Sequence, residues 1–155
     1  VCGFSAGGHL AGSLGVFWNS EPGIKREDKK NKPDGMILAY PVITSGEKAH
    51  RGSIDNISQG NKALAEHVSL EKNVNGDTPP AFIWHTFEDT CVPVENSLYM
   101  AMALREHNIP TEMHIFPKGE HGLSLANDFV AGDETGILED VGEWIKMAIR
   151  WIKSL

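Results

Sequence analysis

Three short strand-like segments, set between segments of helical periodicity, constrain the fold of this chain most strongly. They cover residues 35–40, 81–86 and 111–116. The first is a continuous apolar run, which is typical of a strand that is buried on both faces of a sheet. Apolar side chains at helical spacing predict helices over residues 6–18, 94–107 and 140–152. Because helices and strands alternate, we predict an α/β fold with a parallel sheet covered on both faces.

The connections between these elements differ in length and character. Residues 19–34 are polar and carry a basic cluster at 29–32, which predicts a solvated loop. Residues 44–79 are rich in Gly, Ser, Asn and Asp, and we expect an irregular connection there. One short helix is predicted within it over residues 62–67, because Asn61 can cap the first turn.

Composition narrows the classes of partner. The net charge of −7 at pH 7 argues against binding to nucleic acid or to an anionic membrane, since both would repel an acidic surface. No apolar run reaches the ~20 residues that span a bilayer. The two cysteines, Cys2 and Cys91, are too few for a disulfide framework and favour a cytoplasmic location. The chain does not begin with Met, so any signal peptide for secretion would lie upstream of Val1.

The candidate nucleophile is Ser5, in the pattern Gly3-x-Ser5-x-Gly7. With 16 glycines in 155 residues, this pattern alone is weak. Its context is stronger, because a nucleophile elbow turns sharply from strand to helix and tolerates only small neighbours. The residues after Ser5 are small and a helical pattern begins at once, whereas the preceding strand is visible only as residues 1–2.

A serine hydroxyl needs a base to accept its proton and an acid to hold that base. Functional side chains of parallel sheets lie beyond the carboxyl ends of the strands. The loop after residues 81–86 contains Asp89, our preferred acid, with Glu88 as the alternative. The loop after residues 111–116 contains His121, our candidate base. The resulting chain order of Ser, Asp and His is the one that this architecture uses.

The other histidines are expected to have structural roles. His85 ends its strand and should support the acid loop, and His9 should make a structural hydrogen bond in the first helix. His114 lies within a predicted doubly buried strand and should be a core residue. The remaining three are placed in loops or on helix surfaces, and of these only His50 could line a pocket.

Together these residues predict acyl transfer to Ser5 and then to water. His121 would remove the Ser5 proton, and Asp89 would orient the imidazole. The N–H of Ala6 would supply one donor of the oxyanion hole, and the second would come from a loop upstream of Val1.

Three stretches of the sequence closely resemble α/β-hydrolase esterases of the acetyl esterase group and their acetyl-xylan and feruloyl esterase-like relatives. They are GFSAGGHLAG, PPAFIWHTFEDTCVPVENS and HIFPKGEHGLSLA. By motif, Ser5 matches the family nucleophile, Asp89 the acid and His121 the base. The resemblance implies a mostly parallel sheet flanked by helices and hydrolysis of small-molecule esters, often with short acyl groups and sometimes with acetyl groups on carbohydrates. It implies no cofactor and no metal.

The resemblance also implies that residues 1–155 are the C-terminal portion of a single α/β-hydrolase domain, with the N-terminal strands and an oxyanion loop upstream. We therefore expect residues 1–155 alone to be inactive. Two other functions stay open at this point. A serine peptidase of the prolyl-oligopeptidase type shares the fold and triad order, but usually has an aromatic residue where this chain has Ala6. A non-catalytic hydrolase-fold binding module would normally lack a triad member, and this chain has all three.

Overall fold

The structure is a computed structural model, and it describes residues 1–19 and 30–155. The predicted solvated loop over 19–34 is therefore described only in part, but its basic cluster is described from residue 30 onward, where residues 30 and 31 are exposed. Within the described part of the chain, no helix combines the length and the apolar character needed to cross a membrane. Cys2 and Cys91 are both free and exposed.

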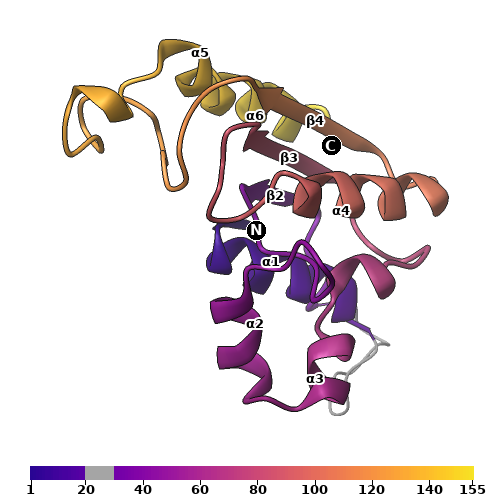
Figure 1. The fold of residues 1–155 in the computed structure, drawn as a ribbon. Coiled ribbons are helices and arrows are strands. Elements are labelled where there is room, and N and C mark those ends of the chain that lie inside the picture. The colour runs from indigo at the N-terminus through magenta and orange to yellow at the C-terminus, as the bar shows by residue number, and fades with distance from the viewer. Residues whose placement is uncertain (20–29) are drawn as a thin grey trace.

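Four described strands form one parallel sheet in the order β1-β2-β3-β4. They are β1 (Cys2–Phe4), β2 (Met36–Ala39), β3 (Ala81–Thr86) and β4 (Thr111–Phe116). Because all four run in the same direction, their carboxyl ends lie side by side along the same edge of the sheet, the edge at which the strands end (Figure 1). The predicted α/β fold with a parallel sheet is confirmed.

Helices connect the strands and cover both faces of the sheet. They are α1 (Ala6–Phe17), α2 (Arg51–Ser58), α3 (Lys62–His67), α4 (Glu95–Glu106), α5 (Glu139–Gly142) and α6 (Trp144–Ile152), with short 3-10 turns η2 (Leu70–Lys72) and η3 (Glu134–Gly136). In Figure 1, α1 and α4 lie on one side of the sheet and α6 lies on the other.

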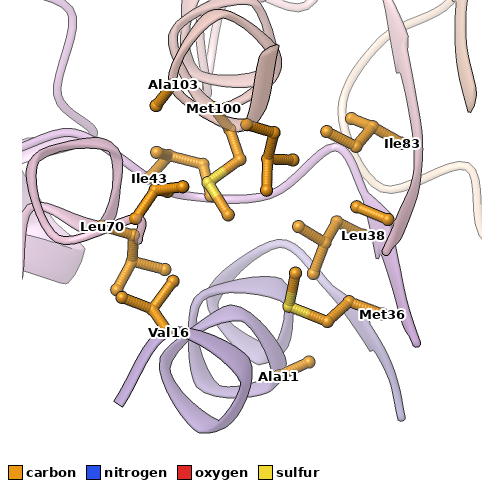
Figure 2. Packing of buried hydrophobic residues seen from close by; sticks show 12 residues of the cluster. Ala11, Val16, Met36, Leu38, Ile43, Leu70, Ile83, Met100 and Ala103 are labelled. Carbon is orange, nitrogen blue, oxygen red and sulfur yellow. The ribbon is translucent and has the colours of Figure 1, made fainter. Parts of the chain in front are cut away.

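The two central strands are buried on both faces, which the apolar run of residues 35–40 predicts for β2. On one face Leu38 and Ile83 share a cluster with Met100 of α4 and with residues of α1 (Figure 2). On the other face Trp84 packs against α6 and stacks on Trp144, with ring centroids 5.3 Å apart. Alternate residues of one strand thus belong to opposite layers, which holds the sheet between its helices.

The connection after β2 contains more helix than the sequence predicts. Helix α3 and its Asn61 cap are confirmed, but α2 was not expected. The side chain of His50 caps α2 by accepting a hydrogen bond from the N–H of Ser53, and histidine is not among the usual capping residues. Only Ile54 and Ser58 of this helix are buried, so its apolar pattern is too sparse to recognise.

Two further expectations need correction. β4 is one of the two edge strands of the described sheet, and His114 is therefore partly exposed rather than a core residue. Its Nε2 instead lies 2.8 Å from Oε1 of Glu112 on the same strand. The single helix predicted over 140–152 is divided at Glu143 into α5 and α6, next to Gly142, which is a poor helix former.

The buried side chain of Asn96 joins the end of β2 to α4. Its Oδ1 accepts hydrogen bonds from the N–H groups of Ile43 and Thr44, at 2.9 and 3.1 Å. Its Nδ2 donates to the carbonyls of Lys48 and Pro93, both at 2.9 Å. All the hydrogen-bonding capacity of the amide is thus used to fix one loop.

Replacing Asn96 should therefore destabilise the fold more than replacing an asparagine that only caps a helix. We expect Asn96→Ala to lower the free energy of unfolding by about 2–4 kcal/mol, because two buried N–H groups lose their acceptor. The matched control is Asn61→Ala, which removes an exposed cap and should cost about 1 kcal/mol. Urea denaturation of the purified variants measures both values, and equal losses would contradict this account.

Candidate active site

Ser5 lies in the turn between β1 and α1. Its φ of 53° and ψ of −121° are rarely adopted by residues other than glycine. Two backbone hydrogen bonds fix the turn against the end of β2. The Ser5 N–H donates to the Ala39 carbonyl at 3.0 Å, and the Val42 N–H donates to the Ser5 carbonyl at 3.1 Å. The turn thus holds Ser5 at the edge of the sheet where the strands end.

Close packing around Ser5 requires glycine at positions 3 and 8, whereas the sequence pattern contains Gly3 and Gly7. A Cβ at Gly3 would lie 2.0 Å from the carbonyl oxygen of Gly7, and one at Gly8 would lie 2.8 Å from the Cβ of Pro41. A Cβ at Gly7 would meet no described atom within 4 Å. Because residues 3 and 8 have no side chain, α1 can begin directly after Ser5 and pack closely against β1 and Pro41.

The three residues singled out from the sequence lie in one continuous hydrogen-bond chain. His121 Nε2 is 2.7 Å from Ser5 Oγ, and His121 Nδ1 is 2.6 Å from Asp89 Oδ2. A carboxylate can only accept a hydrogen bond, so Nδ1 carries the proton in this arrangement. In a neutral imidazole Nε2 is then the acceptor that faces the Ser5 hydroxyl. The arrangement can therefore transfer the Ser5 proton to His121.

The carboxylate of Asp89 is buried and held by four hydrogen bonds. Oδ1 accepts from the N–H groups of Cys91 and Val92, at 3.0 and 2.9 Å. Oδ2 accepts from His121 and also from His85 Nε2, at 3.2 Å. Burial raises the pKa of Asp89, but the hydrogen bonds from His121, His85 and the Val92 N–H outweigh it and hold that pKa well below its usual range. Asp89 is thus a carboxylate at neutral pH.

Glu88, the alternative acid, has a different position. Its side chain is exposed, and its Oε2 accepts a hydrogen bond from the N–H of Gly119 at 3.2 Å. Glu88 therefore contacts the backbone of the loop that carries His121, whereas Asp89 contacts the imidazole itself.

His85 and His9 have the structural roles expected of them. His85 is fully buried, and besides Asp89 its Nε2 contacts the Val92 carbonyl at 2.9 Å, while its Nδ1 contacts Ser97 Oγ at 2.7 Å. His9 Nε2 lies 2.8 Å from the carbonyl of Val68, and burial lowers the pKa of His9.

Ala6 is the first residue of α1, directly after Ser5. The first N–H groups of a helix have no acceptor within the helix, and the helix dipole is positive at this end. The Ala6 N–H can therefore act as a donor to an anionic oxygen beside Ser5.

A cavity of about 510 Å³ lies beside His121, between the loop after β4 and residues 130–138. Its charged lining is predominantly acidic, with the carboxylates of Glu88, Glu120 and Asp133 and the single ammonium of Lys118. Among the described residues there is no cluster of three or more His, Cys, Asp or Glu that could hold a metal ion.

One residue that contacts this arrangement was not identified from the sequence. Tyr40 packs its ring against the imidazole of His121, with centroids 5.0 Å apart. It ends the apolar run of β2 and therefore looks like a core residue in the sequence. The Pro41 that follows was the only signal of an unusual turn at this position.

Comparison with known proteins places this geometry in context. Residues 44–137, more than half of the chain, match the sequence profile of the prolyl oligopeptidase family. The chain is 48% identical over 132 residues to endo-1,4-beta-xylanase B of Butyrivibrio fibrisolvens, which covers 83% of this chain and 21% of that protein. It is 32% identical over 153 residues to an acetylxylan esterase of Xylanibacter ruminicola, which covers 94% of this chain and 30% of the relative.

Solved structures give the same relationship. The acetyl ester-xyloside bifunctional hydrolase of Caldicellulosiruptor lactoaceticus is 42% identical and matches 99% of this chain with a TM-score of 0.83. A carboxylesterase of Lactobacillus plantarum is 28% identical and also matches 99% of the chain, with a TM-score of 0.74. This chain spans 55% and 57% of the lengths of those two structures.

The glycines around Ser5 give a stability prediction. We expect Gly3→Ala to destabilise the protein by at least about 3 kcal/mol, because the new Cβ would overlap backbone atoms that cannot move independently. Gly7→Ala is the matched control and should be neutral or slightly stabilising, since its Cβ has space and alanine favours a helix. Thermal and urea unfolding measure the stability of the two variants. A loss of unfolding free energy in Gly7→Ala as large as that in Gly3→Ala would contradict the close packing assigned to Gly3.

The low pKa of Asp89 gives a pH prediction. Below about pH 4 an aspartate in the unfolded chain binds a proton while folded Asp89 stays charged, so falling pH favours unfolding. The stability that Asp89 contributes is therefore complete above about pH 4 and is lost as the pH falls towards its folded-state pKa. We expect the difference in unfolding free energy between the wild type and Asp89→Asn to be largest near pH 7 and to shrink below pH 4. A difference that is the same at pH 3.5 and pH 7 would contradict the pKa direction.

Proposed function

The chain is an acetyl-xylan esterase-like α/β hydrolase that belongs to the prolyl oligopeptidase family, and on this premise we propose that it hydrolyses carboxylic esters through Ser5, His121 and Asp89. The observation that carries the proposal is the hydrogen-bond chain from Ser5 Oγ through His121 to Asp89. Acyl transfer requires a nucleophile within hydrogen-bond distance of a base, and an acid that holds the other side of that base.

The reaction proceeds in two acyl transfers. His121 Nε2 takes the proton of Ser5 while Oγ attacks the ester carbonyl carbon, which forms a tetrahedral oxyanion. The oxyanion collapses, the carbon–oxygen bond to the alcohol breaks, and the imidazolium returns the proton to the leaving alcohol. Water then attacks the acyl-serine with His121 again as the base, and the acid product leaves Ser5 protonated. Asp89 keeps its negative charge throughout and stabilises the imidazolium.

The Ala6 N–H is the oxyanion donor that this chain supplies. Ala6 follows Ser5 directly and is the first residue of α1. The positive end of the helix dipole therefore favours the developing negative charge at this N–H.

We further propose that the substrates are esters of short acyl groups, including acetyl groups on carbohydrates. Two of the similar proteins are named as an acetylxylan esterase and as an acetyl ester-xyloside hydrolase. The cavity beside His121 is large enough for a sugar unit as the leaving alcohol, and its carboxylates can accept hydrogen bonds from hydroxyl groups.

The proposed partner is thus a small-molecule ester. The net charge of −7 argues against nucleic acid or an anionic membrane as a partner, for the reason given above. A cytoplasmic location stays a prediction from the low number of cysteines.

A peptidase is the second candidate function, and the match to the prolyl oligopeptidase family is the observation that favours it. Its chemistry would use the same three residues on an amide bond. Turnover of 4-nitrophenyl acetate and of a proline-linked peptide anilide by the same preparation discriminates the two activities.

The test of the proposal is labelling and turnover at Ser5. We expect the purified whole protein to hydrolyse 4-nitrophenyl acetate and acetylated xylo-oligosaccharides, and to react with a serine-directed phosphonate at Ser5. Ser5→Ala should abolish labelling and reduce kcat at least about 10³-fold, because the variant lacks the hydroxyl that would form the acyl intermediate.

Ser13→Ala is the matched control. Ser13 lies in α1, the helix that follows Ser5, and its Oγ is 3.4 Å from Nδ1 of His9 rather than at the triad. The Ser13→Ala variant should be labelled at Ser5 and should have the kcat of the wild type. Labelling that survives in Ser5→Ala would contradict the assignment of the nucleophile. A protein that hydrolyses no ester in a broad panel would instead point to a binding module.

A further inference from the structure

We propose that Tyr40 is a positioning residue that holds the imidazole of His121 in the orientation needed for proton transfer. This inference rests on the proposed function, because the orientation matters for catalysis only if His121 moves a proton. Tyr40 is buried, with 5% of its surface exposed, and it lies directly after β2 at the edge of the sheet where Ser5 also lies.

The aromatic contact restrains a motion that the hydrogen bonds leave free. Ser5 and Asp89 hold the two nitrogens of His121, but the ring can still rock about the line that joins these atoms. The Tyr40 ring packs against the imidazole at an interplanar angle of 72°, with centroids 5.0 Å apart. The Tyr40 ring also packs edge-on with Trp84, with ring centroids 4.9 Å apart and an interplanar angle of 88°. Tyr40 is thus held by the core and in turn blocks this rocking.

The hydroxyl of Tyr40 fixes the loop that carries His121. Its oxygen accepts a hydrogen bond from the N–H of Ser124 at 3.0 Å, three residues beyond His121. The carbonyl of Ser124 accepts a second hydrogen bond, from Trp144 Nε1 at 2.8 Å. Ser124 has a φ of 52°, which a serine adopts only where neighbouring groups hold it. Tyr40 therefore acts on both the side chain and the backbone of this loop.

The backbone of Tyr40 is itself strained. Its φ is 35°, a rare value for an aromatic residue and rarer still before a proline. Its N–H donates to the carbonyl of Trp84 at 2.7 Å, which fixes the residue in this conformation. A core residue that only filled space would not require this conformation, whereas it brings the Tyr40 ring against His121.

The test compares two Tyr40 variants with a packing control in the whole protein. Tyr40→Phe keeps the ring and removes the bond to Ser124, and Tyr40→Leu removes both. Phe82→Leu removes a buried ring from the same cluster, but Phe82 packs against His114 and Trp151 rather than against His121. The readouts are kcat and KM for an acetyl ester, and the far-downfield proton NMR resonance of the His121 Nδ1–H that is hydrogen-bonded to Asp89.

We expect Tyr40→Phe to lower kcat about threefold to tenfold, the effect of one hydrogen bond, with KM unchanged. Tyr40→Leu should lower kcat about 10²-fold and broaden or abolish the downfield resonance, because a reacting group is misplaced. Phe82→Leu should lose stability but keep both kcat and the resonance. A Tyr40→Leu variant that matches Phe82→Leu in kcat and in the resonance would overturn the inference, and so would a Tyr40→Phe variant with the wild-type kcat and the wild-type Ser124 amide shift.

The NMR arm separates this inference from the proposed function. If the wild type hydrolyses no ester, the proposed function fails, but the resonance still reports whether Tyr40 holds His121 against Asp89. A resonance that is lost in Tyr40→Leu and kept in Phe82→Leu would then support positioning, and one that is kept in both would reject it.

Discussion

The rest of the site depends on the pair of backbone hydrogen bonds that joins Ser5 to the end of β2. The Ser5 amide donates to Ala39, and its carbonyl accepts from Val42, so the strained turn is held on both sides by one neighbouring segment. Tyr40 lies between those two partners in sequence, and its ring contacts His121. The junction that holds Ser5 thus also fixes the residue that packs against His121. This coupling follows from parallel strands, whose carboxyl ends lie side by side at one edge of the sheet.

Asp89 is held by a different part of the fold. One oxygen of Asp89 accepts hydrogen bonds from the backbone of its own loop at Cys91 and Val92, which orients the carboxylate independently of the two imidazoles. The other oxygen contacts both His121 and His85, and His85 is connected to α4 through the hydroxyl of Ser97. These donors offset the unfavourable burial of the charge, so that Asp89 remains ionised where it can stabilise an imidazolium. The hydrogen bonds that keep the carboxylate ionised therefore also set its direction.

Much of this arrangement could be predicted from the sequence, because it depends on periodicity and chain order. β2 was visible as a continuous apolar run and β3 as a strand-like segment, and three loops at the same edge of a parallel sheet had to bring Ser5, Asp89 and His121 near one another. Helix α2 could not be predicted, because a histidine side chain caps it and few of its residues are buried. The partial exposure of β4 depends on its position at the side of the sheet, and the residues of β4 alone do not indicate that position. The contact of Tyr40 with His121 depends on a positive φ at Tyr40. An aromatic residue rarely adopts such a value, so there was no reason in the sequence to expect it.

Backbone strain in this protein is concentrated where the chemistry is proposed. Six described residues other than glycine have a positive φ, and four of them belong to the site or to the loop that carries the base: Ser5, Tyr40, Ser124 and Ala126. The other two follow the ends of α2 and α4, where a left-handed residue is common. Each strained residue costs about 1–3 kcal/mol, so the site can persist only because hydrogen bonds and ring contacts over-determine it. A rigid, strained loop around His121 is what preorganised proton transfer needs, since a base that must be reoriented in every turnover would raise the barrier.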